Sequence, residues 1–114
     1  MALVTARINA AVDSAVATST HVQLHTGAPG GSGTSNVAAG VSRAALTWGT
    51  TSGGVKTGTA TWTIPGAGGP YTDASLWDAA TAGTYYGSAS LAPQETFAGA
   101  GTLGLTLTVT GTSS

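Results

Sequence analysis

The chain is short of the residue types that carry most protein chemistry. None of its 114 residues is a cysteine, which excludes a disulfide framework and a thiolate metal site. Only 6% are charged, against roughly 25% in ordinary soluble domains. The basic residues are Arg7, Arg43 and Lys56. Because duplex binding by charge neutralisation needs several phosphate contacts from such residues, we expect no nucleic-acid partner.

Long apolar runs are also missing. No stretch of about 18 apolar residues could span a bilayer, and no basic amphipathic helix suggests a membrane surface, so we expect no membrane partner. The first three residues carry no positive charge, and Arg7, Asn9 and Asp13 interrupt the apolar stretch that follows. A signal peptide is therefore not expected. Synthesis in a bacterial cytoplasm fits best.

No catalytic set can be named. There is no cysteine nucleophile and no Gly-x-Ser-x-Gly elbow. Asp73 follows a turn and Asp78 ends a strand, positions where carboxylates usually accept bonds from backbone donors. Gly99, Gly101 and Gly104 match the spacing of a dinucleotide fingerprint, but a strand rather than a helix follows them. We therefore expect neither an enzyme nor a cofactor.

Two histidines deserve a test as metal ligands. His21 and His25 lie in HVQLHT, which alternates like a half-buried strand with Val22 and Leu24 on the inner face. Four residues of strand span about 13 Å, so the two rings cannot share an ion. Since no third ligand lies nearby in the sequence, we expect no metal, and we interpret both as surface or loop-anchoring histidines.

The remaining composition predicts one folded domain. Hydrophobic residues make up 41%, the net charge is −1 and the mean hydropathy is +0.21, unlike a disordered chain. A surface of Thr, Ser and Gly repels its own copies little, which favours a protein that works in an assembly. A GC-rich coding sequence would give the same composition, and this alternative stays open.

Apolar spacing predicts one helix, followed by strands. Residues 2–17 place an apolar stripe at spacings of three and four, formed by Val4, Ile8, Ala11, Val12, Ala15 and Val16. We therefore divide the single domain 1–114 into an N-terminal helix or arm, 1–19, and a β-domain, 20–114. The helix is expected to sit over a sheet edge or to extend to a neighbour.

Alternating residues and Gly-rich turns organise the β-domain. Strands are expected at 21–26, 41–48, 55–64, 74–79, 84–91 and 103–110. Residues 27–40 read as a long loop, and turns are expected at 49–54 and 65–70. The pattern indicates an all-β fold, an antiparallel β-sandwich or barrel-like domain with one N-terminal α-helix.

The aromatic residues have two interpretations. Trp48 and Trp62 fall on the apolar faces of their strands, which favours core packing. A sugar-binding platform is the alternative. Tyr85 and Tyr86 are adjacent, so one of them must face outward on a strand. That tyrosine is the best candidate for an intersubunit contact.

Two motifs carry a family resemblance. Residues 24–30, LHTGAPG, resemble the Leu-His-Thr-x-x-Pro-Gly segment of small virion proteins from phages of actinobacteria, whose genes are often labelled tail fibre or minor tail. Residues 41–43, VSR, and 76–83, LWDAATAG, match further segments in the same order, so the similarity covers roughly 20–110. One departure is Ala28, where relatives often carry Asp.

The resemblance implies a structural protein of the virion and leaves its place open. Because the chain is one compact domain, we favour a capsid decoration (cement) protein on the head exterior, bound to the major capsid protein. The alternatives are a tail-tip or tail-fibre component bound to tail proteins, and a carbohydrate-binding module for the host envelope. A homo-oligomer is expected, with a trimer favoured by closed symmetry. The candidate contact residues are His25, Pro29, Asn36, Arg43, Tyr85 and Tyr86.

Overall fold

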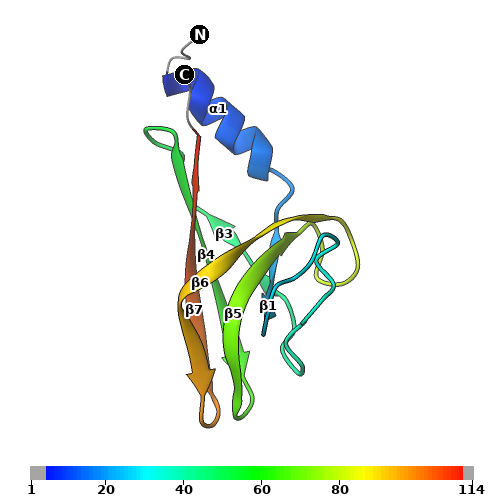
Figure 1. The fold of residues 1–114 in the computed structure, drawn as a ribbon. Helices are drawn as coiled ribbons and strands as arrows, with labels where there is room; N and C mark the ends of the chain where they lie inside the picture. Colours follow the sequence, from blue (N-terminus) through cyan, green and yellow to red (C-terminus); the bar gives the residue numbers. More distant parts are fainter. Residues whose placement is uncertain (1–4, 112–114) are drawn as a thin grey trace.

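The computed structural model describes residues 5–111 and confirms a mostly β fold with one N-terminal helix (Figure 1). The elements in chain order are α1 (Thr5–Val16), β1 (His21–His25), β2 (Ala44–Ala45), β3 (Thr47–Trp48), β4 (Val55–Ile64), β5 (Gly68–Trp77), β6 (Tyr85–Phe97) and β7 (Gly101–Thr110). No helix in this part of the chain is long and apolar enough to cross a membrane.

Two antiparallel sheets make up the sandwich. One sheet has the order β2-β1-β5-β6 and the other β3-β4-β7. β4 and β7 pair without a register break from Val55↔Thr110 to Ile64↔Gly101. The turns 65–67 and 98–100 both carry the chain from one sheet to the other, at the end far from the helix (Figure 1). β6 and β7 each come last in the order of their sheet, so both are edge strands.

Period-two alternation places the core between the sheets. Along β4, Ala60, Trp62 and Ile64 are buried while the threonines between them are exposed. Leu103 of β7 is the register partner of Trp62 and is also buried. Burying a side chain of this size stabilises a domain by about 1.5–3 kcal/mol, so this row supplies a large part of the stability.

The predicted half-burial of the first strand is wrong. Gln23 and His25, expected on an exposed face, are buried like Val22 and Leu24. The segment that follows β1 folds back over that face: the amide of Ala38 donates to the Leu24 carbonyl, and the Gln23 side chain donates to the Val41 carbonyl. The loop that follows β1 therefore covers the second face.

The segment 41–48 also differs from expectation. It was predicted as one strand, but it forms β2 in one sheet and β3 in the other. The expected turn at 65–70 is shorter, because β5 begins at Gly68 and extends the predicted strand 74–79 backwards. Likewise β6 continues to Phe97, beyond the predicted 84–91. These strands lengthen where long neighbours satisfy their backbone groups.

The helix lies at one end of the three-stranded sheet and gives the molecule its length of 49 Å against 24 and 21 Å (Figure 1). Val12 and Val16 are buried and Ile8 is partly buried, as predicted. Ala11 and Ala15, expected in the same stripe, are exposed, whereas Ile8 and Val12 lie against Gly54 and Gly111. Val4 lies outside the described residues.

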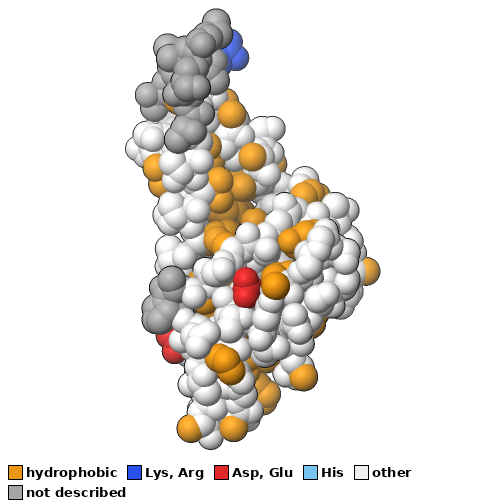
Figure 2. Space-filling model, in the orientation of Figure 1, with side chains coloured by type: hydrophobic (Ala, Val, Ile, Leu, Met, Phe, Trp, Pro, Cys, Tyr) orange, Lys and Arg blue, Asp and Glu red, His pale blue; other side chains and the backbone are white. Residues whose placement is uncertain are grey.

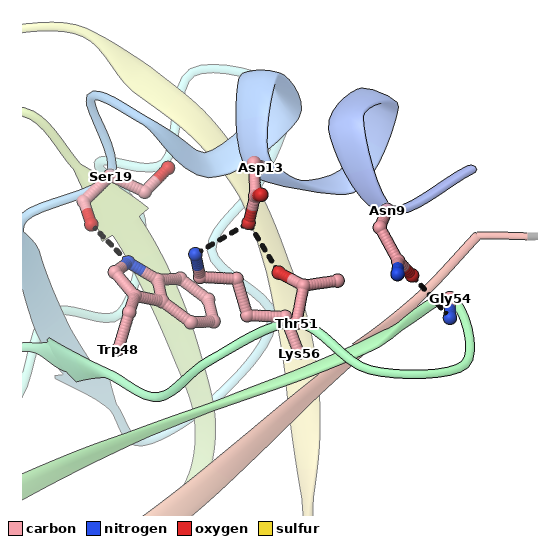
Figure 3. A network of polar contacts seen from close by, with 7 residues as sticks. All are labelled: Asn9, Asp13, Ser19, Trp48, Thr51, Gly54 and Lys56. Carbon is pink, nitrogen blue, oxygen red and sulfur yellow. Dashed lines mark hydrogen bonds and ion pairs between the residues drawn. The ribbon is translucent and has the colours of Figure 1, made fainter. Parts of the chain in front are cut away.

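Polar contacts fix the helix to the turn between β3 and β4 (Figure 3). The Asn9 side chain accepts a bond of 2.6 Å from the Gly54 amide. Asp13 accepts bonds from the Thr51 hydroxyl and, at 2.7 Å, from the Lys56 ammonium. Both bonds lower the pKa of Asp13, that from Lys56 most. The helix is thus held by these polar bonds and by the apolar side chains of Ile8, Val12 and Val16.

Candidate contact surface

His25, at the end of β1, is fully buried and connects the following loop to the sheet. Its Nδ1 donates to the Ser35 carbonyl at 2.9 Å, because that carbonyl can only accept. Its Nε2 then accepts from the Ser75 hydroxyl at 2.6 Å, and Ser75 Oγ accepts from the Trp77 indole at 2.8 Å. This chain of bonds gives both ring nitrogens of His25 a partner and ties the loop 26–42 to the sheet, which agrees with the loop-anchoring interpretation.

The loop 26–42 also closes on itself. Pro29 is buried, while Asn36 is exposed and adopts a positive φ of 54°. The Asn36 side-chain amide donates to the Ala28 carbonyl at 2.9 Å. Gly33 lies directly on Tyr85, where a Cβ would overlap the ring, and its φ of 73° also favours glycine. The loop is therefore packed against the start of β6.

Arg43 ends this loop and packs on Trp77. Its guanidinium carbon lies 3.9 Å from the centre of the Trp77 ring. Nη1 donates to the carbonyls of Ala79 at 2.8 Å and Ala82 at 2.6 Å. Partial burial lowers the pKa of Arg43, and the nearby Asp78 acts in the opposite direction. The charge of Arg43 thus stabilises the turn 78–84 from inside the domain.

The turn 78–84 confirms one carboxylate prediction and corrects another. Asp78 Oδ1 accepts from the Thr84 amide at 2.8 Å, as expected for a turn carboxylate. Asp73 instead accepts from two side-chain hydroxyls, those of Thr72 and Ser90, because backbone pairing within the sheet already satisfies the amides around it. Trp77, which comes just before this turn, is 5% exposed and therefore buried.

The two tyrosines point in opposite directions. Tyr85 is half-buried, with its ring centre 5.5 Å from that of Trp77. Tyr86 is 44% exposed, and its hydroxyl lies 3.5 Å from Asp78 Oδ2. Trp62 is buried as predicted, whereas Trp48 is half-buried and donates to the Ser19 carbonyl (Figure 3).

Loop 26–42, turn 78–84 and Tyr86 together form one contiguous region, here called the contact surface. Gly33 joins the loop to Tyr85, and Arg43 joins it to the turn. Of the six candidate contact residues, the structure exposes Asn36 and Tyr86, half-buries Arg43 and Tyr85, and buries His25 and Pro29. Residues 5–111 contain no group of three His, Asp or Glu side chains that could hold a metal ion.

Sequence reasoning missed a second surface feature. The alternation in residues 103–110 places Leu105, Leu107 and Val109 on one face of a strand, but each of the three is only half-buried. They line two neighbouring cavities of about 340 and 210 Å³ between β7 and the strands β5 and β6. We call this region the apolar trough; its residues are Val22, Ala74, Leu76, Gly87–Leu91 and Leu105–Thr110. The absence of any charge in β7 was the signal in the sequence.

Comparison with known proteins gave one match. The family model described as "Podophage GP4 fiber I protein gp80" matches residues 3–109. No curated protein and no solved structure matches the chain significantly.

Proposed function

Because the chain belongs to the podophage GP4 fiber I protein gp80 family, we propose that it is a subunit of a tail fibre. The observation that carries the proposal is the extent of the match, which takes in the helix and all the strands. Its partners are then tail proteins and further copies of itself, and we keep the homo-trimer expected from the sequence as the proposed assembly, since a three-fold ring is one of the closed symmetries of homo-oligomers.

Family membership also decides several expectations from the sequence. The chain is a fibre protein of the virion and belongs to a structural, non-enzymatic family, which confirms the expected location and the absence of an enzyme. The resemblance seen in the motifs is confirmed at the level of a phage protein; a host among actinobacteria stays a prediction. The family favours the fibre alternative over the decoration protein that the size of the chain suggested.

The shape suits a fibre segment. The helix extends the molecule at one end and the two inter-sheet turns close the other, over 49 Å (Figure 1). We assign contacts with other virion proteins to the exposed part of the contact surface, Asn36 and Tyr86. His25, Pro29, Arg43 and Tyr85 support that surface from beneath. Repeated weak contacts across several copies add up as avidity.

The carbohydrate alternative gains no support from the described residues. A sugar platform needs exposed aromatic faces, but Tyr86 is the only aromatic side chain among them that is exposed. Its neighbour Tyr85 packs on Trp77 instead.

Location and copy number test the proposal together. Quantitative mass spectrometry of purified virions should find the protein at least an order of magnitude below the major capsid protein, and antibody labelling should mark tails. Abundance comparable with the capsid protein, with label spread over heads, would refute the tail-fibre proposal and restore the decoration hypothesis. Washing at high salt should leave the protein bound, because few of its contacts are ionic.

A further inference from the structure

We propose that the apolar trough between β6 and β7 is the interface through which copies of this chain associate. The inference deepens the proposed function, since it rests on a fibre built from several copies. It assigns the association to one side of the sandwich, distinct from the contact surface formed by loop 26–42 and turn 78–84.

The first argument is incomplete burial. Leu103 is 4% exposed, but the next inward-facing residues of the strand, Leu105, Leu107 and Val109, stay half-buried. On the side of β4, Leu107 lies beside Gly58, where the Leu46 and Trp48 side chains fill the space that a Cβ would take. The opening lies on the other side of β7, toward the residues of β5 and β6 that line the two cavities. Figure 2 shows hydrophobic side chains gathered between the helix and the body of the domain. Three aliphatic side chains in a row are therefore left partly exposed in a single copy of the chain.

The second argument is the unprotected edge. Among the strands of residues 5–111, β7 pairs with β4 alone, so its other side presents backbone donors and acceptors along ten residues. Isolated proteins usually protect such an edge with lysine, proline or a bulge. β7 has no charged residue and no proline, and its pairing with β4 shows no register shift. The strand is built to be paired or covered.

A second copy is the occupant that fits. No residue of the trough is charged, and the whole chain carries a net charge of −1, so two copies meet without electrostatic repulsion. In a closed trimer the side of each copy that carries β7 meets the neighbouring copy, and the period of two keeps the leucines of β7 together on one face of the strand. A charged peptide, in contrast, would find no counter-charge in the trough.

The area that a stable interface buries shows how much of the side of the domain that carries β7 must be in contact. Pairing of β7 edges alone would bury about 330 Å² per copy, for a strand about 33 Å long and a layer about 10 Å thick. A stable interface needs roughly 600–1,000 Å² per copy. A side of 49 by 21 Å offers about 1,000 Å². The contact between two copies must therefore include the trough as well as the edge of β7.

Matched variants test the interface. Leu107→Asp places a carboxylate in the trough, and Thr61→Asp places one on the exposed outer face of β4. We expect the wild type and Thr61→Asp to be oligomers by light scattering, and the dissociation constant of Leu107→Asp to rise by about 100-fold or more, because an unpaired charge would be desolvated. Circular dichroism checks that each variant is folded.

A second pair guards against misfolding of Leu107→Asp. Ser88 is exposed at the rim of the trough, so Ser88→Lys should dissociate the oligomer without disturbing the core, while Thr59→Lys on the outer face should not. Because the chain lacks cysteine, single substitutions Thr108→Cys and Thr61→Cys also report proximity. We expect dimers cross-linked by a thiol-reactive bifunctional reagent in the first variant alone.

Three results would overturn the interface: a monomeric wild type at its highest soluble concentration, an oligomer that survives both Leu107→Asp and Ser88→Lys, or equal cross-linking at the two cysteines. None of these depends on where the protein lies in the virion. A monomer found on tails would refute the interface and leave the fibre proposal standing, whereas a trough-dependent oligomer found on heads would do the opposite.

Discussion

The buried chain of bonds through His25 allows a quantitative test. In Ser75→Ala the hydroxyl that donates to His25 Nε2 and accepts from Trp77 Nε1 is lost, and both nitrogens stay buried. An unsatisfied buried polar atom costs about 1–3 kcal/mol, so two of them should cost about 2–6 kcal/mol. A domain of this size is stabilised by about 5–15 kcal/mol in total. The variant should be folded but much less stable.

Urea unfolding measures this difference, with Ser88→Ala as the control. Ser88 is exposed on a neighbouring strand, so its change should stay within about 0.5 kcal/mol. The slope of the transition should be the same in all variants, because the area exposed on unfolding hardly changes. A loss below about 1 kcal/mol for Ser75→Ala would refute the reasoning, since the two nitrogens would then have other partners.

A double-mutant cycle separates the bond from the packing. His25→Phe keeps a ring of similar size but leaves the Ser75 hydroxyl without its acceptor. In the double variant with Ser75→Ala, neither group of that pair is left unsatisfied. We therefore expect the double variant to cost about 1–2 kcal/mol less than the sum of the single variants. Strict additivity would show that the two residues do not interact.

Three further predictions concern other parts of the fold. Trp77→Ala should lose about 3–5 kcal/mol, as truncation of large buried aromatics does, and thermal melting will show it; an unchanged Tm would make Trp77 a surface residue. Gly33→Ala should lower the free energy of unfolding by about 1–3 kcal/mol, because the φ of 73° at Gly33 disfavours a side chain and the Cβ would overlap the Tyr85 ring. Gly31→Ala, with open space around it, is the control, and equal losses in the two variants would contradict this prediction. The contacts of Asp13 lower its pKa below the usual 3.8. Its stabilising effect is therefore present above that pH and is lost as the pH falls through the lowered value. The protection of the α1 amides, relative to their intrinsic exchange rates, should accordingly fall at acid pH in the wild type but not in Asp13→Asn.

Local pattern was enough to predict several elements of this protein. The alternation in residues 55–64 and 103–110 predicts β4 and β7, and the stripe through Ile8, Val12 and Val16 predicts the helix. The absence of cysteine and the low charge exclude disulfides and thiolate sites and argue against nucleic-acid binding. These conclusions hold because a period of two or of 3.6 residues is a property of the backbone itself.

The tertiary structure alone decided which faces are covered. His25 and Gln23 are buried because loop 26–42 folds back over β1, and Arg43 is used inside the domain because turn 78–84 places carbonyls beside it. Leu107 stays half-buried because it faces two cavities between β7 and the strands β5 and β6. Alternation gives a strand an inner and an outer face, but what lies against each face depends on segments distant in the chain, and the sequence does not state those contacts.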